Sequence, residues 1–309
     1  MSSNKFWIKK NNLLVYWFVL FCFTFVNGEI SYAASECDSP RPEWLFCEDF
    51  EVDKLSDTDW FYNSEGNPYF PSCTNACAEV TTKTSHSGSK SVRAYVPAGN
   101  SGASARGYQV FEGQEEIYIS YYIRWQENPP FVFNSNRASH QTYIFAGTFN
   151  NPMNTDLTFY LDTEDVTIQP RLVIKAILQE GSSDLYISYP NEAYGSYKPI
   201  PWNIATPAGC IVGNWYKIEI HLKMNSFTGA IPNPDGIIRL WVDGTLVTEY
   251  TDAILRGPSF STIKFKRFLF GPNYPPSGPP QGQDTYWDDI LITKGYPLKA
   301  PVINAITIK

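Results

Sequence analysis

Asn214-Trp-Tyr-Lys-Ile-Glu-Ile-His-Leu-Lys-Met-Asn225 alternates apolar and polar residues for about ten residues, and this stretch decides the fold. Asp235-Gly-Ile-Ile-Arg-Leu-Trp-Val-Asp-Gly244 alternates in the same way and ends in an Asp-Gly turn dipeptide. Tyr286-Trp-Asp-Asp-Ile-Leu-Ile292 is typical of a closing strand. A side-chain period of two indicates strands with one buried face, so this part of the chain predicts antiparallel β-structure.

The rest of the chain continues this pattern. Glu116–Trp125 places Ile117, Ile119, Tyr121, Ile123 and Trp125 on one face. Further strands are predicted over Trp44–Glu51, Ser85–Val96, Gln141–Phe149, Leu157–Asp162, Pro170–Gln179, Leu185–Tyr189 and Thr262–Leu269. No long segment has the apolar spacing of a helix. Many short strands with turn residues between them favour an all-β sandwich or barrel.

The first 34 residues have the three parts of a secretory signal peptide. A basic start is followed by an apolar run from Leu13 to Val26 and by small residues around Ala33 and Ala34. A membrane anchor is the alternative, but the apolar run is shorter than the ~20 residues that span a bilayer. We therefore expect residues 1–34 to be a signal peptide and residues 35–309 to be one domain, secreted to the extracellular space or the periplasm and not inserted in a membrane.

Charge and cysteine content agree with this prediction. Without residues 1–34 the chain keeps 21 basic and 30 acidic side chains, a formal charge of −9, which argues against nucleic acid as a partner. An acidic polysaccharide stays compatible if basic residues gather locally. Cys37 with Cys47 and Cys73 with Cys77 are plausible disulfides in an oxidising compartment, which leaves Cys210 without an assigned partner. A zinc site at Cys73 and Cys77 would need a second Cys/His pair at ligand spacing.

Three motifs carry a resemblance to a known group. Phe46-Cys-Glu-Asp-Phe-Glu51, the hairpin from Trp215 to Gly244, and Tyr286-Trp-Asp-Asp289 resemble the concanavalin A-like (laminin-G-like) jelly-roll β-sandwich. Within that group the chain resembles secreted polysaccharide lyases of the heparin lyase I and glucuronan lyase type. The resemblance extends over nearly all of the mature chain in the order of its elements. It implies a sugar polymer as partner, although the same sandwich also hosts lectins and hydrolases.

The candidate chemistry favours a lyase over a hydrolase. The carboxylate pattern of hydrolases with this fold, Glu-x-Asp-x-x-Glu, is absent from the sequence. Elimination from a uronate instead needs a base, a proton donor and groups that hold the sugar carboxylate. We predict His140 as base and Tyr143 or Tyr160 as donor. The predicted substrate-binding residues are Gln141, Arg171, Lys175, Gln179 and Tyr274.

Several of these assignments have a second interpretation. In lyases of this fold Gln and His are separated by one residue, whereas Gln141 directly follows His140, so either a β-bulge redirects one of them or only one faces the substrate. Arg171 and Lys175 could be solvent-facing charges. Tyr274 either stacks on a sugar ring or covers the edge of the sandwich.

Alternation makes two further predictions about side-chain placement. It puts Lys264 and Lys266 on one face of their strand, as a second basic row. It also puts His221 on the solvated side of a sheet, together with Lys217, Glu219 and Lys223.

The acidic residues of the first and last strands have a separate explanation. The resemblance implies a structural Ca²⁺ held by Glu51, Asp288 and Asp289, since calcium favours six to eight oxygen ligands. Hydrogen-bonded capping of a strand end is the alternative. No organic cofactor is expected, and the protein is expected to be a monomer. The predicted function is cleavage of a uronic-acid-containing polysaccharide by β-elimination; the alternative is a non-catalytic, lectin-like carbohydrate-binding protein.

Overall fold

The computed structural model describes residues 37, 40–55, 58, 60, 76–100, 105–132, 139–147, 157–165, 170–178, 211–274 and 278–297. All of them belong to one compact unit, Ala34–Lys309. The predicted signal peptide, the predicted strand Leu185–Tyr189, Gln179 and Cys210 lie outside the described residues. Within the described ranges, no helix has the length and apolar character needed to cross a bilayer.

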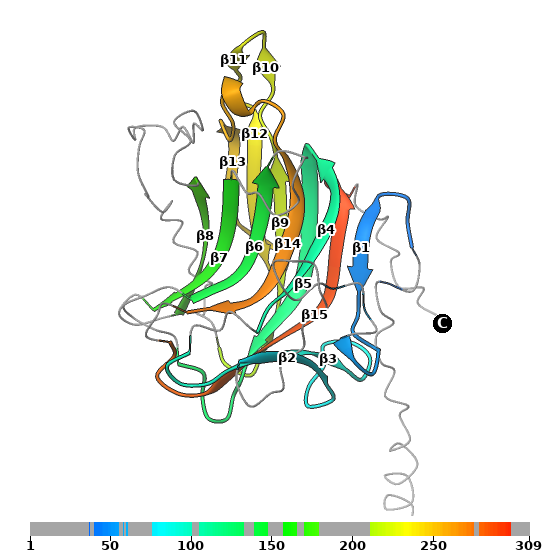
Figure 1. The fold of residues 1–309 in the computed structure, drawn as a ribbon, viewed down its shortest axis with the longest axis vertical. Coiled ribbons are helices and arrows are strands. Elements are labelled where there is room, and N and C mark those ends of the chain that lie inside the picture. Colours follow the sequence, from blue (N-terminus) through cyan, green and yellow to red (C-terminus); the bar gives the residue numbers. More distant parts are fainter. Residues whose placement is uncertain are drawn as a thin grey trace, which may run out of the picture. The chain divides into compact units, whose positions relative to one another are not determined.

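Strands make up two antiparallel sheets, seen as two layers in Figure 1. The eight-stranded sheet has the order β13-β12-β9-β5-β15-β3-β2, and β1 also pairs with β15. Its strands are β1 (Trp44–Glu48), β2 (Cys77–Thr81), β3 (Ser91–Val96), β5 (Glu116–Trp125), β9 (Trp215–Lys223), β12 (Gly236–Val242), β13 (Thr245–Ala253) and β15 (Gln283–Lys294). The first strand therefore lies beside the last, as expected of a jelly roll.

The five-stranded sheet has the order β4-β14-β6-β7-β8. Its strands are β4 (Gly107–Gln114), β6 (Ser139–Gly147), β7 (Leu157–Asp165), β8 (Pro170–Leu178) and β14 (Lys264–Asn273). A short hairpin, β10 (Phe227–Thr228) with β11 (Ile231–Pro232), and a 3-10 turn, η3 (Pro258–Phe260), complete the described elements. No strand is predicted over β4, because its alternation is broken by Gly107 and Gly113.

The core lies between the two sheets. All five residues predicted to share the buried face of β5 are fully buried: Ile117, Ile119, Tyr121, Ile123 and Trp125. Tyr121 reaches the other sheet, where its ring lies 5.8 Å from that of Phe268 and its hydroxyl lies 2.9 Å from Thr142 Oγ1. Burial raises the pKa of Tyr121 far above its usual value. The predicted face of β5 is confirmed, and the fold is an all-β jelly-roll sandwich.

The predicted hairpin from Trp215 to Gly244 corresponds to β9 and β12, which are paired antiparallel, and the predicted Asp-Gly turn joins β12 to β13. Asp243 and Gly244 both have positive φ, 49° and 73°, as a two-residue type I′ turn requires. Asp243 Oδ1 accepts a hydrogen bond of 2.8 Å from Lys217 N on β9. The Asp-Gly dipeptide thus closes the hairpin and also ties it to the next strand.

The structure confirms one of the two predicted disulfides. Cys37 and Cys47 are joined, which fastens the residues before β1 to that strand. Cys77 is also disulfide-bonded, and its predicted partner, Cys73, lies outside the described residues.

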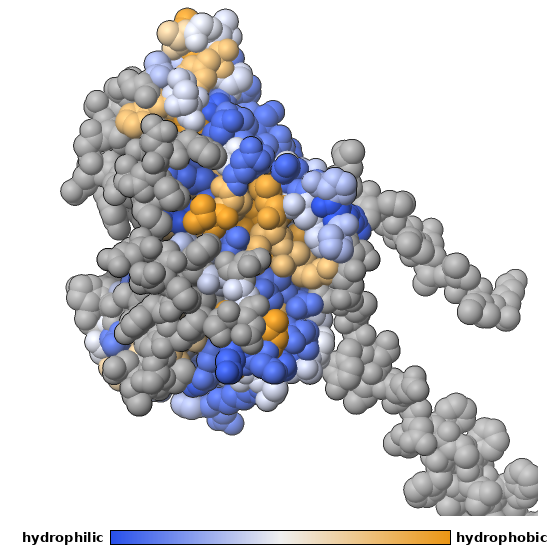
Figure 2. All heavy atoms as spheres, turned by 45° about the vertical axis from the view of Figure 1, so that its right-hand side comes forward, coloured by the Kyte–Doolittle hydropathy of each residue, from blue (hydrophilic) through white to orange (hydrophobic). Residues whose placement is uncertain are grey.

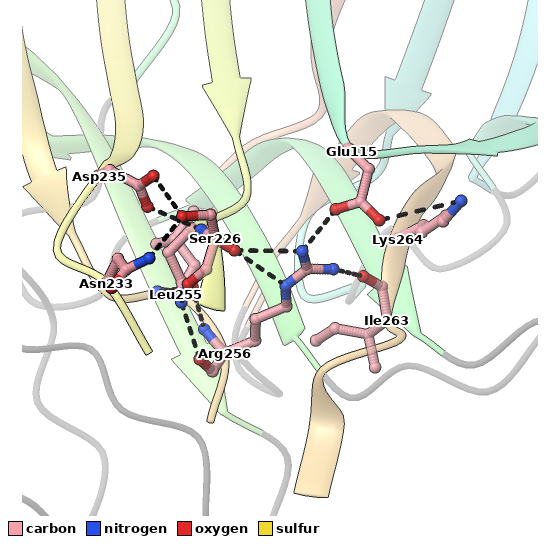
Figure 3. A network of polar contacts seen from close by, with 9 residues as sticks. Glu115, Ser226, Asn233, Asp235, Leu255, Arg256, Ile263 and Lys264 are labelled. Atoms are coloured by element: carbon pink, nitrogen blue, oxygen red, sulfur yellow. Dashed lines mark hydrogen bonds and ion pairs between the residues drawn. The ribbon is translucent and has the colours of Figure 1, made fainter. Parts of the chain in front are cut away.

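A buried polar network holds the connection from β13 to β14, which passes from one sheet to the other (Figure 3). Arg256 donates to Ile263 O at 2.8 Å and to Asn225 O at 3.1 Å, and it pairs with Glu115 Oε2 at 2.6 Å. Asn225 Oδ1 in turn accepts hydrogen bonds of 2.9 Å from the backbone N–H groups of Leu255 and Arg256. The start of β14 is therefore anchored to the ends of β4 and β9.

Candidate functional site

A row of paired residues crosses the outer face of the five-stranded sheet, the face turned away from the core. Successive partners in the row are Tyr108, Leu269, Tyr143, Tyr160 and Lys175, one from each of β4, β14, β6, β7 and β8. Residues opposite each other in antiparallel strands belong to the same face of the sheet. The register therefore brings Tyr143, Tyr160 and Lys175, which the sequence predicts to act together, onto one line.

Arg267 lies one row away and is nearly buried, with 7% of its surface exposed. Its guanidinium carbon lies 4.0 Å from the ring centroid of Phe145 and 5.8 Å from that of Tyr108. Such cation–π contacts stabilise a desolvated cation. Burial nevertheless lowers the pKa of Arg267 to about 10, so the side chain keeps its charge at neutral pH.

A β-bulge turns Arg267 to this face. The register of β14 shifts between Phe265 and Arg267 against both β4 and β6. Phe265 is buried in the core, and two residues later Arg267 points the opposite way, because one extra residue reverses the alternation. The prediction that Lys264 and Lys266 form one basic row is therefore wrong. The Lys264 side chain is 41% exposed and lies 3.8 Å from Glu115 Oε1, whereas Lys266 is buried.

A second guanidinium, that of Arg106, lies 5.6 Å from the ring centroid of Tyr143. The Tyr143 and Phe145 rings are nearly parallel and 5.7 Å apart. Arg106, Tyr108, Tyr143, Phe145 and Arg267 together form what we call the Arg267 cluster. It combines two cations with three aromatic rings, which is suited to an anionic, ring-shaped ligand such as a uronate.

The structure has a β-bulge at His140 and Gln141, two neighbours that would point to opposite faces of a regular strand. Pairing of β6 with β7 shifts between His140 and Thr142, so His140 is opposite Asp162 and Thr142 is opposite Leu161. Gln141 is the extra residue and is fully buried. The irregularity that would allow both residues to serve one site is thus present, while the roles of His140 and Gln141 stay predictions.

The remaining predicted substrate-binding residues are placed differently. Arg171 is paired in register with Glu164, near the end of the β7–β8 hairpin. Tyr274 is 4% exposed and belongs to the hydrophobic core, where its hydroxyl accepts a hydrogen bond of 2.7 Å from Gln283 Nε2. It covers the interior of the sandwich, and little of its ring is accessible to a sugar.

The three carboxylates proposed for calcium all contact one loop, Ser85–Lys90. Glu51 Oε1 accepts hydrogen bonds from the N–H groups of Ser89 and Lys90, each 2.8 Å. Asp288 Oδ2 accepts 2.7 Å from His86 N, and Asp289 Oδ2 lies 2.7 Å from His86 Nδ1. Burial, and then the charge of Asp289, raise the pKa of Asp288 to about 8.

These contacts are made by side chains and backbone groups of the protein. Among the described residues, no group of three or more His, Cys, Asp or Glu side chains is arranged to hold a metal ion. Asp288 and Asp289 are nonetheless two adjacent buried acidic groups that face a single histidine. The calcium site stays a prediction.

His221 departs from its predicted environment. It lies on the outer face of the eight-stranded sheet, as alternation predicts, but is only 2% exposed. Its Nε2 lies 2.8 Å from Glu116 Oε1, and its ring packs 5.1 Å from that of Tyr296. Tyr296 follows the last strand, and its position over β9 could not be read from strand alternation.

Sequence patterns did not identify Arg106 or Arg267. Arg106 precedes a strand that was not predicted, and Arg267 depends on a bulge. The one available signal is the basic pair Lys266-Arg267 inside an otherwise aromatic strand, Phe265 to Phe270. A charge that interrupts a buried strand needs a special position, and here the bulge supplies it.

Hydrophobic side chains also reach the surface. Figure 2 shows them in the middle of one face, next to hydrophilic residues, and also at the top and in the lower part of the view.

Comparison with solved structures shows proteins of similar fold at low sequence identity. No family model matches the sequence, and no curated protein matches it either. Alginate lyase vAL-1 from Chlorella virus superposes with a TM-score of 0.50 at 16% identity, over 70% of this chain and 88% of that one. A double mutant of alginate lyase Aly36B in complex with alginate tetrasaccharide gives 0.51 at 15% identity, over 82% and 95%. Endo-β-1,4-glucuronan lyase from the fungus Trichoderma reesei gives 0.47 at 12% identity, over 81% and 95%.

The first two likenesses agree with the two-sheet topology of this chain. The expected resemblance of fold is thereby confirmed. The chain has an all-β jelly-roll fold, similar to that of the two alginate lyases.

Proposed function

We propose that the protein is a polysaccharide lyase that cleaves a uronic-acid-containing polymer by β-elimination at the Arg267 cluster. The observation that carries this proposal is the nearly buried guanidinium of Arg267, held over Phe145 and Tyr108 on the outer face of the five-stranded sheet. A cation with little access to water binds a carboxylate more strongly than an exposed one does, because solvent screening is weaker.

The reaction needs three contributions from the protein. A base takes the proton from the carbon next to the carboxylate, the bond from the adjacent carbon to the glycosidic oxygen breaks, and a carbon–carbon double bond forms. An acid gives a proton to the departing oxygen, and no water is consumed. Neutralising the carboxylate makes the carbon-bound proton more acidic, which is the role we assign to Arg267 and Arg106.

For the proton steps we retain His140 as base and Tyr143 or Tyr160 as donor. Tyr143 and Tyr160 are paired in register, and Arg106 lies over the Tyr143 ring. Arg106 thus places a positive charge beside one of the two proposed proton donors. Lys175, paired in register with Tyr160, is proposed to assist in holding the carboxylate together with Gln141 and Arg171.

The proposal extends to the site of action. Removal of residues 1–34 on export would deliver the chain to an oxidising compartment, and the Cys37–Cys47 disulfide supports such a location. We further propose that calcium binds beside Asp288 and Asp289, where it would relieve the repulsion between two buried carboxylates. Calcium should then raise the midpoint of thermal unfolding of the chelator-treated protein and leave that of Asp289→Asn unchanged.

The activity is tested by ultraviolet absorbance of unsaturated uronate ends. Purified protein would be mixed with alginate, glucuronan, heparin-like and pectic polymers in turn. A rise with one polymer would establish elimination and identify the substrate class. A flat trace with all four, together with retention of the protein in a gel containing one of them, would instead support the lectin-like alternative.

A further inference from the structure

The outer face of the eight-stranded sheet carries a cluster of aromatic rings on the side of the sandwich opposite the Arg267 cluster. Tyr296, 36% exposed, lies at its centre. Its ring centroid is 5.4 Å from that of Tyr118, 5.1 Å from that of His221 and 5.5 Å from that of Trp241. We call these four residues the aromatic platform.

The sheet itself fixes three members of the platform. Tyr118 on β5 is opposite His221 on β9, and Trp241 on β12 is opposite Glu219 of the same β9. The ring planes of Trp241 and Tyr296 are inclined by 32° to one another, with their centroids 5.5 Å apart. Trp241 is partly exposed as well. Two adjacent, partly exposed aromatic rings are suited to contact with the C–H groups of a pyranose ring.

Both acidic and basic side chains surround these rings. Glu219 Oε1 accepts a hydrogen bond from the Tyr118 hydroxyl, and Glu116 Oε1 lies 2.8 Å from His221 Nε2. Arg239 pairs with Glu249 at 2.6 Å. Burial lowers the pKa of His221, which therefore stays neutral at neutral pH.

The charges around the platform select the kind of ligand. Three carboxylates, those of Glu116, Glu219 and Glu249, stand against the cations of Arg239 and of Lys223, which is opposite Glu116. A surface without positive excess gives no electrostatic attraction to a polyanion. Partly exposed carboxylate and guanidinium groups do, however, accept and donate hydrogen bonds to hydroxyl groups.

We infer that the aromatic platform is a second saccharide-binding surface, which takes a neutral, hydroxyl-rich polysaccharide. The two faces of the sandwich then differ in ligand: the Arg267 cluster takes an acidic sugar, and the platform takes an uncharged one. Binding at the platform does not depend on elimination at the other face, so the two proposals can fail separately.

The test is affinity electrophoresis of the full chain in gels containing hydroxyethyl cellulose, with alginate gels run in parallel. We expect retardation by hydroxyethyl cellulose. Trp241→Ala and Tyr296→Ala should each weaken binding roughly tenfold, as loss of an aromatic stacking partner predicts. Ile231→Ala, which alters an exposed residue of the β10–β11 hairpin, is the matched control and should bind like the wild type.

Other outcomes would overturn the inference. They are an unretarded wild-type protein, or Trp241→Ala retarded as strongly as the wild type while its circular dichroism is unchanged. Retention in alginate that is lost in Trp241→Ala would make the platform an acidic-sugar site. A dimer dissociated by Tyr296→Ala in gel filtration would make the occupant a second copy. Binding gained only after removal of residues 298–309 would make it the chain's own tail.

Discussion

Arg267 combines two properties that normally exclude each other, a permanent charge and a nearly buried position. The rings of Phe145 and Tyr108 lower the cost of that burial, and the bulge in β14 keeps the charge out of the core. This position beside two aromatic rings is the basis for assigning Arg267 to carboxylate binding.

Replacing Arg267 by Met should therefore separate activity from stability. We expect kcat/KM for the responsive polymer to fall by about 10²-fold or more, as it does when one group that stabilises developing negative charge is removed. The thermal midpoint should stay the same or rise. Arg41→Met, which removes an exposed arginine just before β1, is the control and should retain activity. Equal losses in the two variants would exclude a specific role for Arg267.

His221 makes stability depend on pH. Burial lowers its pKa in the folded state below its ordinary value of about 6.5, against the opposing effect of Glu116. As pH falls through that value, the unfolded state takes up a proton that the folded state does not, so the free energy of unfolding should decrease. Above about pH 6.5 both states are neutral, and this contribution is constant.

The predicted decrease in stability at low pH is tested by urea unfolding of the wild type and His221→Gln at pH 5 and pH 7. The wild type should lose more stability than the variant on going to the lower pH. Since other titrating groups are common to both proteins, the difference between them reports on His221 alone. A larger loss in the variant would reverse the assigned direction.

Among the elements, most strands were predicted from the sequence, but the side-chain placement was predicted only where alternation is regular. β5 and β9 pair without a register shift, so the sequence predicts both their positions and the buried face of β5. The bulges in β6 and β14 add one residue and reverse the pattern. No local sequence signal marks them, because they depend on pairing with strands far away in the chain.

The connection from β13 to β14 should be sensitive to a single side chain. Asn225→Ala would leave two buried backbone N–H groups, those of Leu255 and Arg256, without their acceptor. We expect a loss of about 2–4 kcal/mol in the free energy of unfolding. Asn233→Ala removes an exposed member of the same network and should cost below about 1 kcal/mol. Denaturant titration would measure both, and similar losses would contradict the assigned importance of burial.

At the scale of the molecule, the sequence predicted the sandwich well and the site only in outline. Tyr143, Tyr160 and Lys175 do fall on one register line, because alternation and strand order are enough to place them. The two guanidinium groups beside them depend on packing between strands. Tyr274 takes the second of its two predicted placements, since it packs in the core and covers the sandwich.

The disulfide at the start of the domain should contribute measurably to stability. Cys37 and Cys47 close a loop of sequence separation 10 and fasten the lead-in to β1. Replacing both by Ser should lower the free energy of unfolding by about 2–3 kcal/mol, since the unfolded chain regains the entropy of that loop. Chemical denaturation of the double variant would measure it. An unchanged midpoint would show that β1 stays in place without the bridge.

The pairing of β15 has a consequence for how the chain acquires its structure during synthesis. β15 is the last described strand in the sequence, yet it lies inside the eight-stranded sheet between β5 and β3 and also pairs with β1. Until it leaves the ribosome, the early strands β1, β2 and β3 lack the partner that joins them to β5. The eight-stranded sheet therefore stays incomplete until β15 has been translated.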